Sequence, residues 1–303
     1  MSATMELTKV IYAEEYHEHI PLLLTGSQFG VVHSIFNNGF NIKIDKNLYF
    51  IGTTKNGSLP FGIHLQHNAL RKLLADLTLE ESVKWEREKG YIAFLDMNYH
   101  IDLQYAKTMK LSINTAKQAD PIIEKNLTPF ISFLLEYGVT TGLDIFAEEF
   151  ILQHLEGAPC QNESEQNLRR LIDVVFSSQP AEIEEVLRFL IGRGKGLTPS
   201  GDDHLVGMLA VLYGTNQHSG VFLQVLKQLV YNGKLTTDVG REYLRYAING
   251  QFSSTVTEVV DQLMNDDQQL LKSKMRRLIE MGHSSGADTL FGMLIGLLAI
   301  RRK

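Results

Sequence analysis

Two segments of this 303-residue chain are nearly the same, and each leads into a long apolar run. SGDDHLVGMLAVL begins at Ser200 and SGADTLFGMLIGL begins at Ser285, and eight of the thirteen aligned positions are identical without a gap. A loop-to-helix unit has therefore been duplicated at an offset of 85 residues. Because each run is apolar on nearly all sides of a helix, both helices are expected inside one helical domain, packed closely at Gly207 and Gly292. Their N-terminal loops are then expected at one shared cleft.

Two interpretations fit the start of each copy. Ser200 and Ser285 have the position of N-cap residues, with Asp203 and Asp288 three residues on, and such a cap contributes about 1 kcal/mol of stability. A cap does not require the other polar and small residues nearby, which are Lys195, Gly196, Thr198, Pro199 and Asp202 in the first copy and His283 and Ser284 in the second. These additional residues favour a ligand site.

The ligand of such a site is restricted by charge. Helix N-termini bind anions, but Lys195 is followed by Gly196, which excludes a Walker A loop, and Pro199 stands where a G-x-G-x-x-G fingerprint needs its third glycine. A carboxylate about 6 Å from a phosphate charge repels it by about 3 kcal/mol at an effective dielectric constant of 20. Three arrangements can offset this repulsion. Arg193 and Lys195 can supply positive charge, or a Mg²⁺ ion can bridge the carboxylates and the phosphate. Alternatively, the aspartates can point away from the phosphate and accept hydrogen bonds from amide N–H groups. A carbamoyl group beside phosphate offers such N–H groups.

Other polar residues are weaker candidates. His283 directly precedes the second Ser-Ser-Gly loop and has the best position for a general acid or base. Thr237, at a helix start in TTDVGREYLRYAINGQF, can line the same cleft. His33 and Ser34 lie in an apolar strand segment, where a histidine is by default structural. The chain has no HExxH motif and no cysteine pair, so no metal ligand is assigned.

Composition excludes several classes of protein. The formal net charge of −6 disfavours a broad nucleic-acid surface. Cys160 is the single cysteine, which rules out an intrachain disulfide and is typical of a reducing cytoplasm. The N-terminus lacks the pattern of a signal peptide. The apolar run at 290–300 is shorter than the roughly 20 residues that span a bilayer, and it predicts a buried helix.

Periodicity predicts an α+β fold. Residues 25–112 contain strand patterns such as FGVVHSIF at 29–36 and FNIKID at 40–45, with a turn at Asp45 to Asn47 and one helix at 78–88, where Thr78 and Glu81 have capping-box spacing. From about Pro121 the period becomes helical, and glycines at 138, 157 and 192 mark helix ends. We expect an antiparallel β-rich sheet or small barrel in a domain at 1–115, and a helical domain with both Ser-Gly-x-Asp motifs at 116–303.

Four segments in order resemble the AllH family, which includes a subunit of oxamate carbamoyltransferase. They are VVHSIFNNGFNIKID at 31–45, GKGLTPSGDDHLVG at 194–207, TTDVGREYLRYAINGQF at 236–252 and GHSSGADTLFGMLIGL at 282–297. The resemblance implies carbamoyl transfer from oxalurate to phosphate in purine or allantoin nitrogen catabolism. It also implies partner subunits of the FdrA and AllG type.

The resemblance and the residues together define the candidate site. Candidate catalytic residues are Asp202, Asp203 and His283, and candidate substrate- or phosphate-binding residues are His33, Ser34, Lys195, Gly196, Thr198, Ser200, Gly201, Thr237, Ser285, Gly286 and Asp288. Backbone N–H groups near Gly201 and Gly286 are candidate oxyanion donors. Two other classes stay open: a non-catalytic phospho-ligand-binding or scaffolding subunit, and a magnesium-dependent hydrolase or phosphotransferase.

Overall fold

The computed structural model describes residues 8–24, 28–113, 120–160, 162–265 and 267–303. The chain divides into two compact units, Met1–Leu111 and Ser112–Lys303. The first unit is built mainly of strands and the second of helices, which confirms the predicted α+β fold.

The first unit is a barrel closed by its first strand. Its strands are β1 (Lys9–His17), β2 (Phe29–Phe36), β3 (Gly39–Ile44), β4 (Asn47–Gly52), β5 (Gly62–Leu65), β6 (Ser82–Glu86), β7 (Tyr91–Phe94), β8 (Tyr99–Asp102) and β9 (Lys107–Met109). The order β5-β4-β3-β2-β6-β7-β8-β1 closes because β1 also pairs with β5, and β9 extends from β1. Helices α1 (Ile20–Leu23) and α2 (His67–Asp76) and the short 3-10 helix Thr54–Asn56 complete the unit.

The barrel is mixed rather than wholly antiparallel. β1 runs parallel to β8 and β9, and β4 runs parallel to β5, while the other neighbours are antiparallel. The small barrel of the sequence analysis is therefore confirmed, and its antiparallel pairing needs this correction. The physical reason for the mixed pairing is the position of β1. This strand precedes the predicted β region in the sequence and lies between β8, which it pairs with in parallel, and β5, which it pairs with antiparallel.

Local patterns in the barrel agree with the sequence for β2 to β4. Phe40, Ile42 and Ile44 are buried on β3, as their alternation predicts. β3 and β4 pair through a tight turn, where Asp45 has a φ of 55°.

The predicted helix at 78–88 is wrong. Ser82–Glu86 is strand β6, in which Val83 and Trp85 alternate into the core. Glu81 does not serve a capping box, because its carboxylate accepts a hydrogen bond from the backbone N–H of Asp96 at 3.1 Å. The two-residue burial period therefore decides the conformation over the capping-box spacing.

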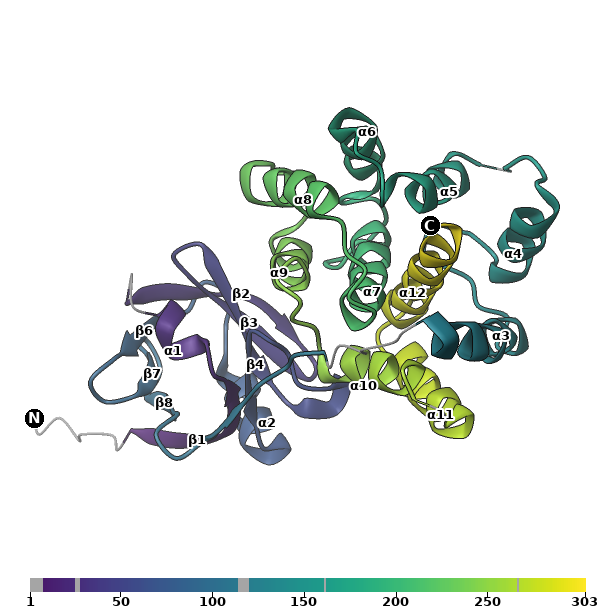
Figure 1. Ribbon diagram of the computed structural model, residues 1–303. Coiled ribbons are helices and arrows are strands. Elements are labelled where there is room, and N and C mark those ends of the chain that lie inside the picture. Colours follow the sequence, from purple (N-terminus) through teal and green to yellow (C-terminus); the bar gives the residue numbers. More distant parts are fainter. Residues whose placement is uncertain (1–7, 25–27, 114–119, 161, 266) are drawn as a thin grey trace, which may run out of the picture. The chain divides into compact units, whose positions relative to one another are not determined.

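The second unit is helical. Its helices are α3 (Asp120–Glu136), α4 (Ala147–Glu156), α5 (Glu163–Val174), α6 (Pro180–Leu190), α7 (Ser200–Gly214), α8 (Gly220–Asn232), α9 (Asp238–Ala247), α10 (Ser254–Leu263), α11 (Gln268–Ile279) and α12 (Ser285–Arg302). Figure 1 shows α7 and α12 side by side within this unit, with α9 and α10 packed on α7 and α3, α5 and α11 packed on α12. Both central helices are buried along nearly their whole length, as predicted. Across the described residues, no helix combines the length and the apolar character needed to cross a membrane.

Glycines set the contact between α7 and α12. A Cβ on Gly207 would lie 2.0 Å from the carbonyl oxygen of Thr289, and a Cβ on Gly292 would lie 2.1 Å from that of His204. Thr289 is the counterpart of His204 at the 85-residue offset, so the two contacts are reciprocal. The helices run in the same direction, since Gly296 further along α12 lies against Met208 further along α7. The duplication thus forms a pseudo-symmetric helix pair.

Candidate functional site

The two motif helices begin next to each other. The hydroxyl of Ser285, at the start of α12, donates to Oδ2 of Asp203 in α7 at 2.7 Å. Nδ1 of His204 lies 3.9 Å from Oδ1 of Asp288. The prediction that both motifs lie at the same end of the helix pair is confirmed by these contacts, whereas a shared ligand cleft stays a prediction. We call Ser200, Asp203, His204, Ser284, Ser285 and Asp288 the paired-motif cluster.

The motif serines are not helix caps. Ser200 is the first residue of α7, whose N-cap is Pro199, and no side chain caps this helix. In α12 the N-cap is Ser284, which also makes no side-chain cap hydrogen bond. The cap interpretation of Ser200 and Ser285 is therefore wrong. The hydroxyl of Ser285 bonds across the helix pair to Asp203, and Asp288 bonds to Gly142 instead of to its own helix end.

Asp202 is a buried carboxylate with both oxygens engaged. Its Oδ1 accepts the backbone N–H of Gly192 at 2.8 Å, and its Oδ2 accepts the hydroxyl of Thr236. The side chain is 1% exposed. Burial raises the pKa of Asp202 to about 6, and the two hydrogen bonds only partly oppose this shift. Asp202 therefore holds the loop after α6 and the start of α9 against α7.

Asp203 is buried among other acids. Burial raises its pKa well above the usual range, and the charges of Asp288 and Asp202 add to the shift, while hydrogen bonds from Ser285 and Thr198 oppose it. Burial also raises the pKa of the Tyr243 phenol in α9, with a smaller contribution from the charge of Asp203. The environment thus favours the protonated form of Asp203.

His204 is fully buried and neutral. Burial lowers its pKa, and the charge of Asp288 opposes this only in part. Since the carbonyl of Ser200 can only accept, Nδ1–H donates to it, which leaves Nε2 as an acceptor. Among the described residues, Nε2 has no hydrogen-bond partner. The ring packs edge-on against Phe291, 5.5 Å between centroids.

Asp288 is covered by a segment from far away in the sequence. Gly142, in the turn between α3 and α4, donates its backbone N–H to Oδ1 of Asp288 at 2.8 Å. A Cβ on Gly142 would lie 2.2 Å from Oγ of Ser200 and 2.8 Å from Oγ of Ser284. A side chain at this position would therefore require these serine hydroxyls to move.

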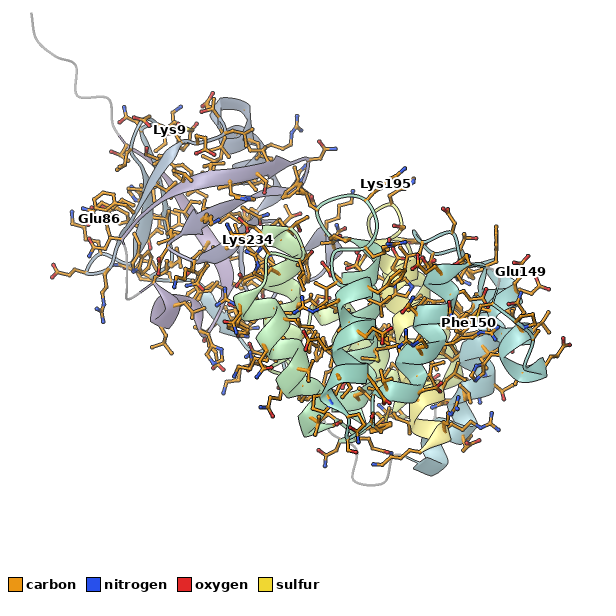
Figure 2. The ribbon with its side chains drawn as sticks, turned by 90° about the horizontal axis from the view of Figure 1, so that it is seen from above. Lys9, Glu86, Glu149, Phe150, Lys195 and Lys234 are labelled. Carbon is orange, nitrogen blue, oxygen red and sulfur yellow. The ribbon has the colours of Figure 1, made fainter. Side chains whose placement is uncertain are left out.

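The loop before α7 has a glycine-dependent shape. Gly194 and Gly196 have φ values of 112° and 89°, which side chains rarely adopt. Thr237 caps α9 and donates to the carbonyl of Leu197, which ties the loop to that helix. Lys195 is exposed, and Figure 2 shows it on the outer side of this loop. Arg193 instead lies 3.5 Å from Glu163 in an ion pair.

The side chains of this cluster are connected by hydrogen bonds. In the part of the chain that the structure describes, no group of three or more His, Cys, Asp or Glu side chains is arranged to hold a metal ion. Asp202 and Asp203 turn to different partners, so they do not converge on one point. Burial raises the pKa of the Cys160 thiol, which disfavours the nucleophilic thiolate.

Comparison with known families assigns both units. Residues 190–297, which include both motifs, match the family described as oxamate carbamoyltransferase subunit AllH. Residues 10–108, which include the barrel strands β2 to β8, match the AllH family N-terminal domain. The chain belongs to the AllH family. Its description supports a carbamoyltransferase subunit that works in a complex with other subunits. No solved structure matches the chain.

The AllH-family fold gathers most of the predicted site residues in the second unit. Asp203, Ser285 and Asp288 share the paired-motif cluster with Ser200, and Thr198 bonds to Asp203. His283 is exposed just before α12.

His33 and Ser34 belong to the first unit. They lie at an irregularity in β2, where the register against β3 shifts between Val32 and Ser34. Nδ1 of His33 is 3.2 Å from Oγ of Ser34, which also accepts the side-chain amide of Asn41 at 2.9 Å.

The proposed oxyanion donors need a correction. The N–H of Gly201 donates to the carbonyl of Arg193 at 2.8 Å, and the N–H of Gly286 donates to that of Met281 at 3.1 Å. Both groups are engaged because each glycine packs against the preceding helix, where a Cβ would lie 2.0 Å from the carbonyl oxygen of Leu190 or Leu278. These N–H groups therefore stabilise the turn that precedes each motif helix.

Several residues of the cluster were missed from the sequence. Gly142 and Gly192 were not singled out as site residues, and their backbone N–H groups bond to Asp288 and Asp202. Thr236, which bonds to Asp202, stands next to the predicted Thr237. A local signal existed only for Gly142, which stands in TTGLD, a small and polar stretch between two helical patterns. Gly192 was interpreted only as a helix end.

Proposed function

We propose that this chain is a subunit of an oxamate carbamoyltransferase that converts oxalurate and phosphate to oxamate and carbamoyl phosphate. The observation that carries the proposal is that the matched family segment contains the paired-motif cluster, in which buried carboxylates and one neutral imidazole lie beside serine hydroxyls. We further propose a role in purine or allantoin nitrogen catabolism, with FdrA-like and AllG-like subunits as partners.

The proposed reaction needs a phosphate site and a carbamoyl site. A phosphate oxygen attacks the carbamoyl carbon of oxalurate, the C–N bond to the oxamate nitrogen breaks, and the phosphate proton moves to that nitrogen. Lys195, on the glycine-shaped loop, supplies the positive charge for the phosphate, and Gly196 leaves the backbone there uncrowded. His283, exposed on the facing loop, carries the proton.

Asp202 and Asp203 have positioning roles in this proposal. Asp202 joins α7 to Gly192 and Thr236, and Asp203 joins α7 to Ser285, so neither carboxyl is left to attack a substrate. No covalent nucleophile is invoked, and bound phosphate attacks directly. Thr237 remains a proposed contact to substrate. His33 and Ser34 remain proposed binding residues of the first unit.

The test is an assay of carbamoyl phosphate formed from oxalurate and phosphate, with this chain alone and with its partner subunits. Activity that requires this chain supports the proposal, whereas full activity of the partner subunits without it would refute a catalytic role and leave a scaffold. Isothermal titration of phosphate and carbamoyl phosphate then locates the anion. Lys195→Ala should weaken binding about tenfold, since one charge contact is lost, and equal affinity in both proteins would remove Lys195 from the site.

A further inference from the structure

One carboxylate oxygen of the cluster is buried without a partner. Asp288 is 0% exposed, and its Oδ1 is occupied by the N–H of Gly142. Its Oδ2 has no hydrogen-bond partner among the described residues. A buried polar atom without a partner is unfavourable in a folded protein and is frequent at functional sites. Its position therefore indicates where a ligand supplies the missing donor.

The surroundings of this oxygen define what it can bind. The Cβ position of Gly142 lies 3.2 Å from Oδ2 of Asp288 and still closer to the hydroxyl oxygens of Ser200 and Ser284. Three side-chain oxygens thus converge on one side of a glycine. Gly142 itself is exposed, whereas Asp288, to which its backbone N–H bonds, is fully buried. Hydroxyls both donate and accept, whereas the carboxylate oxygen only accepts.

A carboxylate oxygen here selects an N–H group and repels phosphate. Within the described residues, no Lys or Arg side chain bonds to Asp288, which contacts the N–H of Gly142 and lies near the ring of His204. A phosphate oxygen at this position would meet like charge at close range. An uncharged NH₂ group, by contrast, can donate to Oδ2 while a hydroxyl beside it accepts a second hydrogen or donates to a carbonyl oxygen.

We infer that Oδ2 of Asp288 accepts a hydrogen bond from the NH₂ of the carbamoyl group, and that the hydroxyls of Ser200 and Ser284 lie next to this group. This inference rests on the proposed carbamoyltransferase function and assigns the carbamoyl specificity to one atom, Oδ2 of Asp288. The phosphate end of the same ligand then points away from Asp288. An acyl phosphate with a methyl group in place of NH₂ leaves Oδ2 unsatisfied and is discriminated against.

The duplicated motif explains why only one of the two aspartates has this role. Asp203, the counterpart of Asp288, receives the hydroxyl of Ser285 from the other copy. By the same symmetry, Ser200 would serve Asp288, but the segment at Gly142 inserts there and bonds to Oδ1 instead. Oδ2 therefore receives no hydrogen bond from the other copy or from Gly142.

The experiment compares carbamoyl phosphate with acetyl phosphate, which differs in replacing NH₂ by CH₃. Affinities are measured by titration calorimetry on the full chain assembled with its partner subunits. Wild type should bind carbamoyl phosphate at least tenfold more tightly. In Asp288→Asn, the N–H of Gly142 holds the amide oxygen at the Oδ1 position, so an NH₂ replaces Oδ2 and opposes the ligand NH₂. The preference should fall at least tenfold.

The matched control is Asp267→Asn, the same change at the start of α11, where the side chain accepts from the N–H of Leu270. It should keep the wild-type preference. Ser284→Ala is a milder second variant, because Ser284 makes no cap hydrogen bond that folding needs, and it should lower the affinity for carbamoyl phosphate a few-fold without changing that for acetyl phosphate.

The outcomes distinguish a failure of this inference from a failure of the proposed function. If wild type prefers carbamoyl phosphate and both Asp288→Asn and Ser284→Ala retain that preference, a water satisfies Oδ2 and this inference is wrong while the proposed function stands. If wild type assembled with its partners binds neither ligand, the proposed function and the inference both fail. If wild type binds both ligands equally, the inference fails alone.

Discussion

The two copies of the Ser-Gly-x-Asp motif are alike in packing and different in hydrogen bonding. Gly207 and Gly292 make reciprocal contacts with the opposite helix, and His204 and Thr289 each donate to the carbonyl of the first serine of their own helix. The carboxylates differ, since Asp203 receives a hydroxyl from the other copy and Asp288 receives a backbone N–H. The duplication therefore gives the two helices the same packing, and the hydrogen-bond partners of the two aspartates are where the copies differ.

The shared packing can be broken at either glycine, and this is the largest effect we expect. Gly207→Ala and Gly292→Ala each place a Cβ about 2 Å from a backbone carbonyl oxygen, which forces the helices apart. Each should lower the free energy of unfolding by about 3 kcal/mol or more, by equal amounts if the pair is symmetric. Urea unfolding followed by circular dichroism measures this.

Gly220→Ala is the control for these variants, because no atom lies within 4 Å of the added Cβ. It should change stability by less than about 0.5 kcal/mol. A cost as small as that of Gly220→Ala at either Gly207 or Gly292 would contradict the close helix contact.

The first copy alone carries a second aspartate, Asp202, where the second copy has Ala287. Its folded pKa of about 6 is above the unfolded value of about 3.8, so its contribution to stability is complete below about pH 4 and is lost as the pH rises to about 6. The loss amounts to about 3 kcal/mol. Asp202→Asn removes this titration and keeps an acceptor for Gly192.

The measurement for Asp202 is urea unfolding at several pH values between 4 and 7. The stability of Asp202→Asn relative to wild type should rise by up to about 3 kcal/mol over this range. Thr289→Val, which changes no titrating group, is the reference and should show a constant difference. A constant difference for Asp202→Asn as well would show that the carboxyl is not the source of pH dependence.

The smallest effect on stability is expected at Thr289, which makes the same hydrogen bond in the second copy that His204 makes in the first. Thr289 donates to the carbonyl of Ser285 at 2.8 Å, as His204 does to Ser200. Thr289→Val keeps the shape and removes this bond, so stability at neutral pH should fall by about 1 kcal/mol. Thermal unfolding of the variant against wild type checks this, and an unchanged midpoint would show that the bond contributes nothing.

Much of the fold was predictable because its signals are local. A β-branched and aromatic run predicted β2, and alternation predicted β3. The helical period after Pro121 predicted the helices of the second unit, and the duplication predicted two buried helices in contact at Gly207 and Gly292. The capping-box spacing of Thr78 and Glu81 misled, because both residues lie in the turn before strand β6, whose burial alternates every second residue.

The sequence by itself determined the duplicated motif, the strand and helix periods and the apolar helices that must be buried. Only the tertiary structure decided that β1 closes the barrel and that Gly142 meets Asp288, because these contacts join segments up to 146 residues apart. Periodicity reports which side of an element is buried but not which distant segment covers it. Packing therefore decides the partner of each motif carboxylate. Asp203 receives the hydroxyl of Ser285, whereas Asp288 receives the backbone N–H of Gly142 and not the hydroxyl of Ser200.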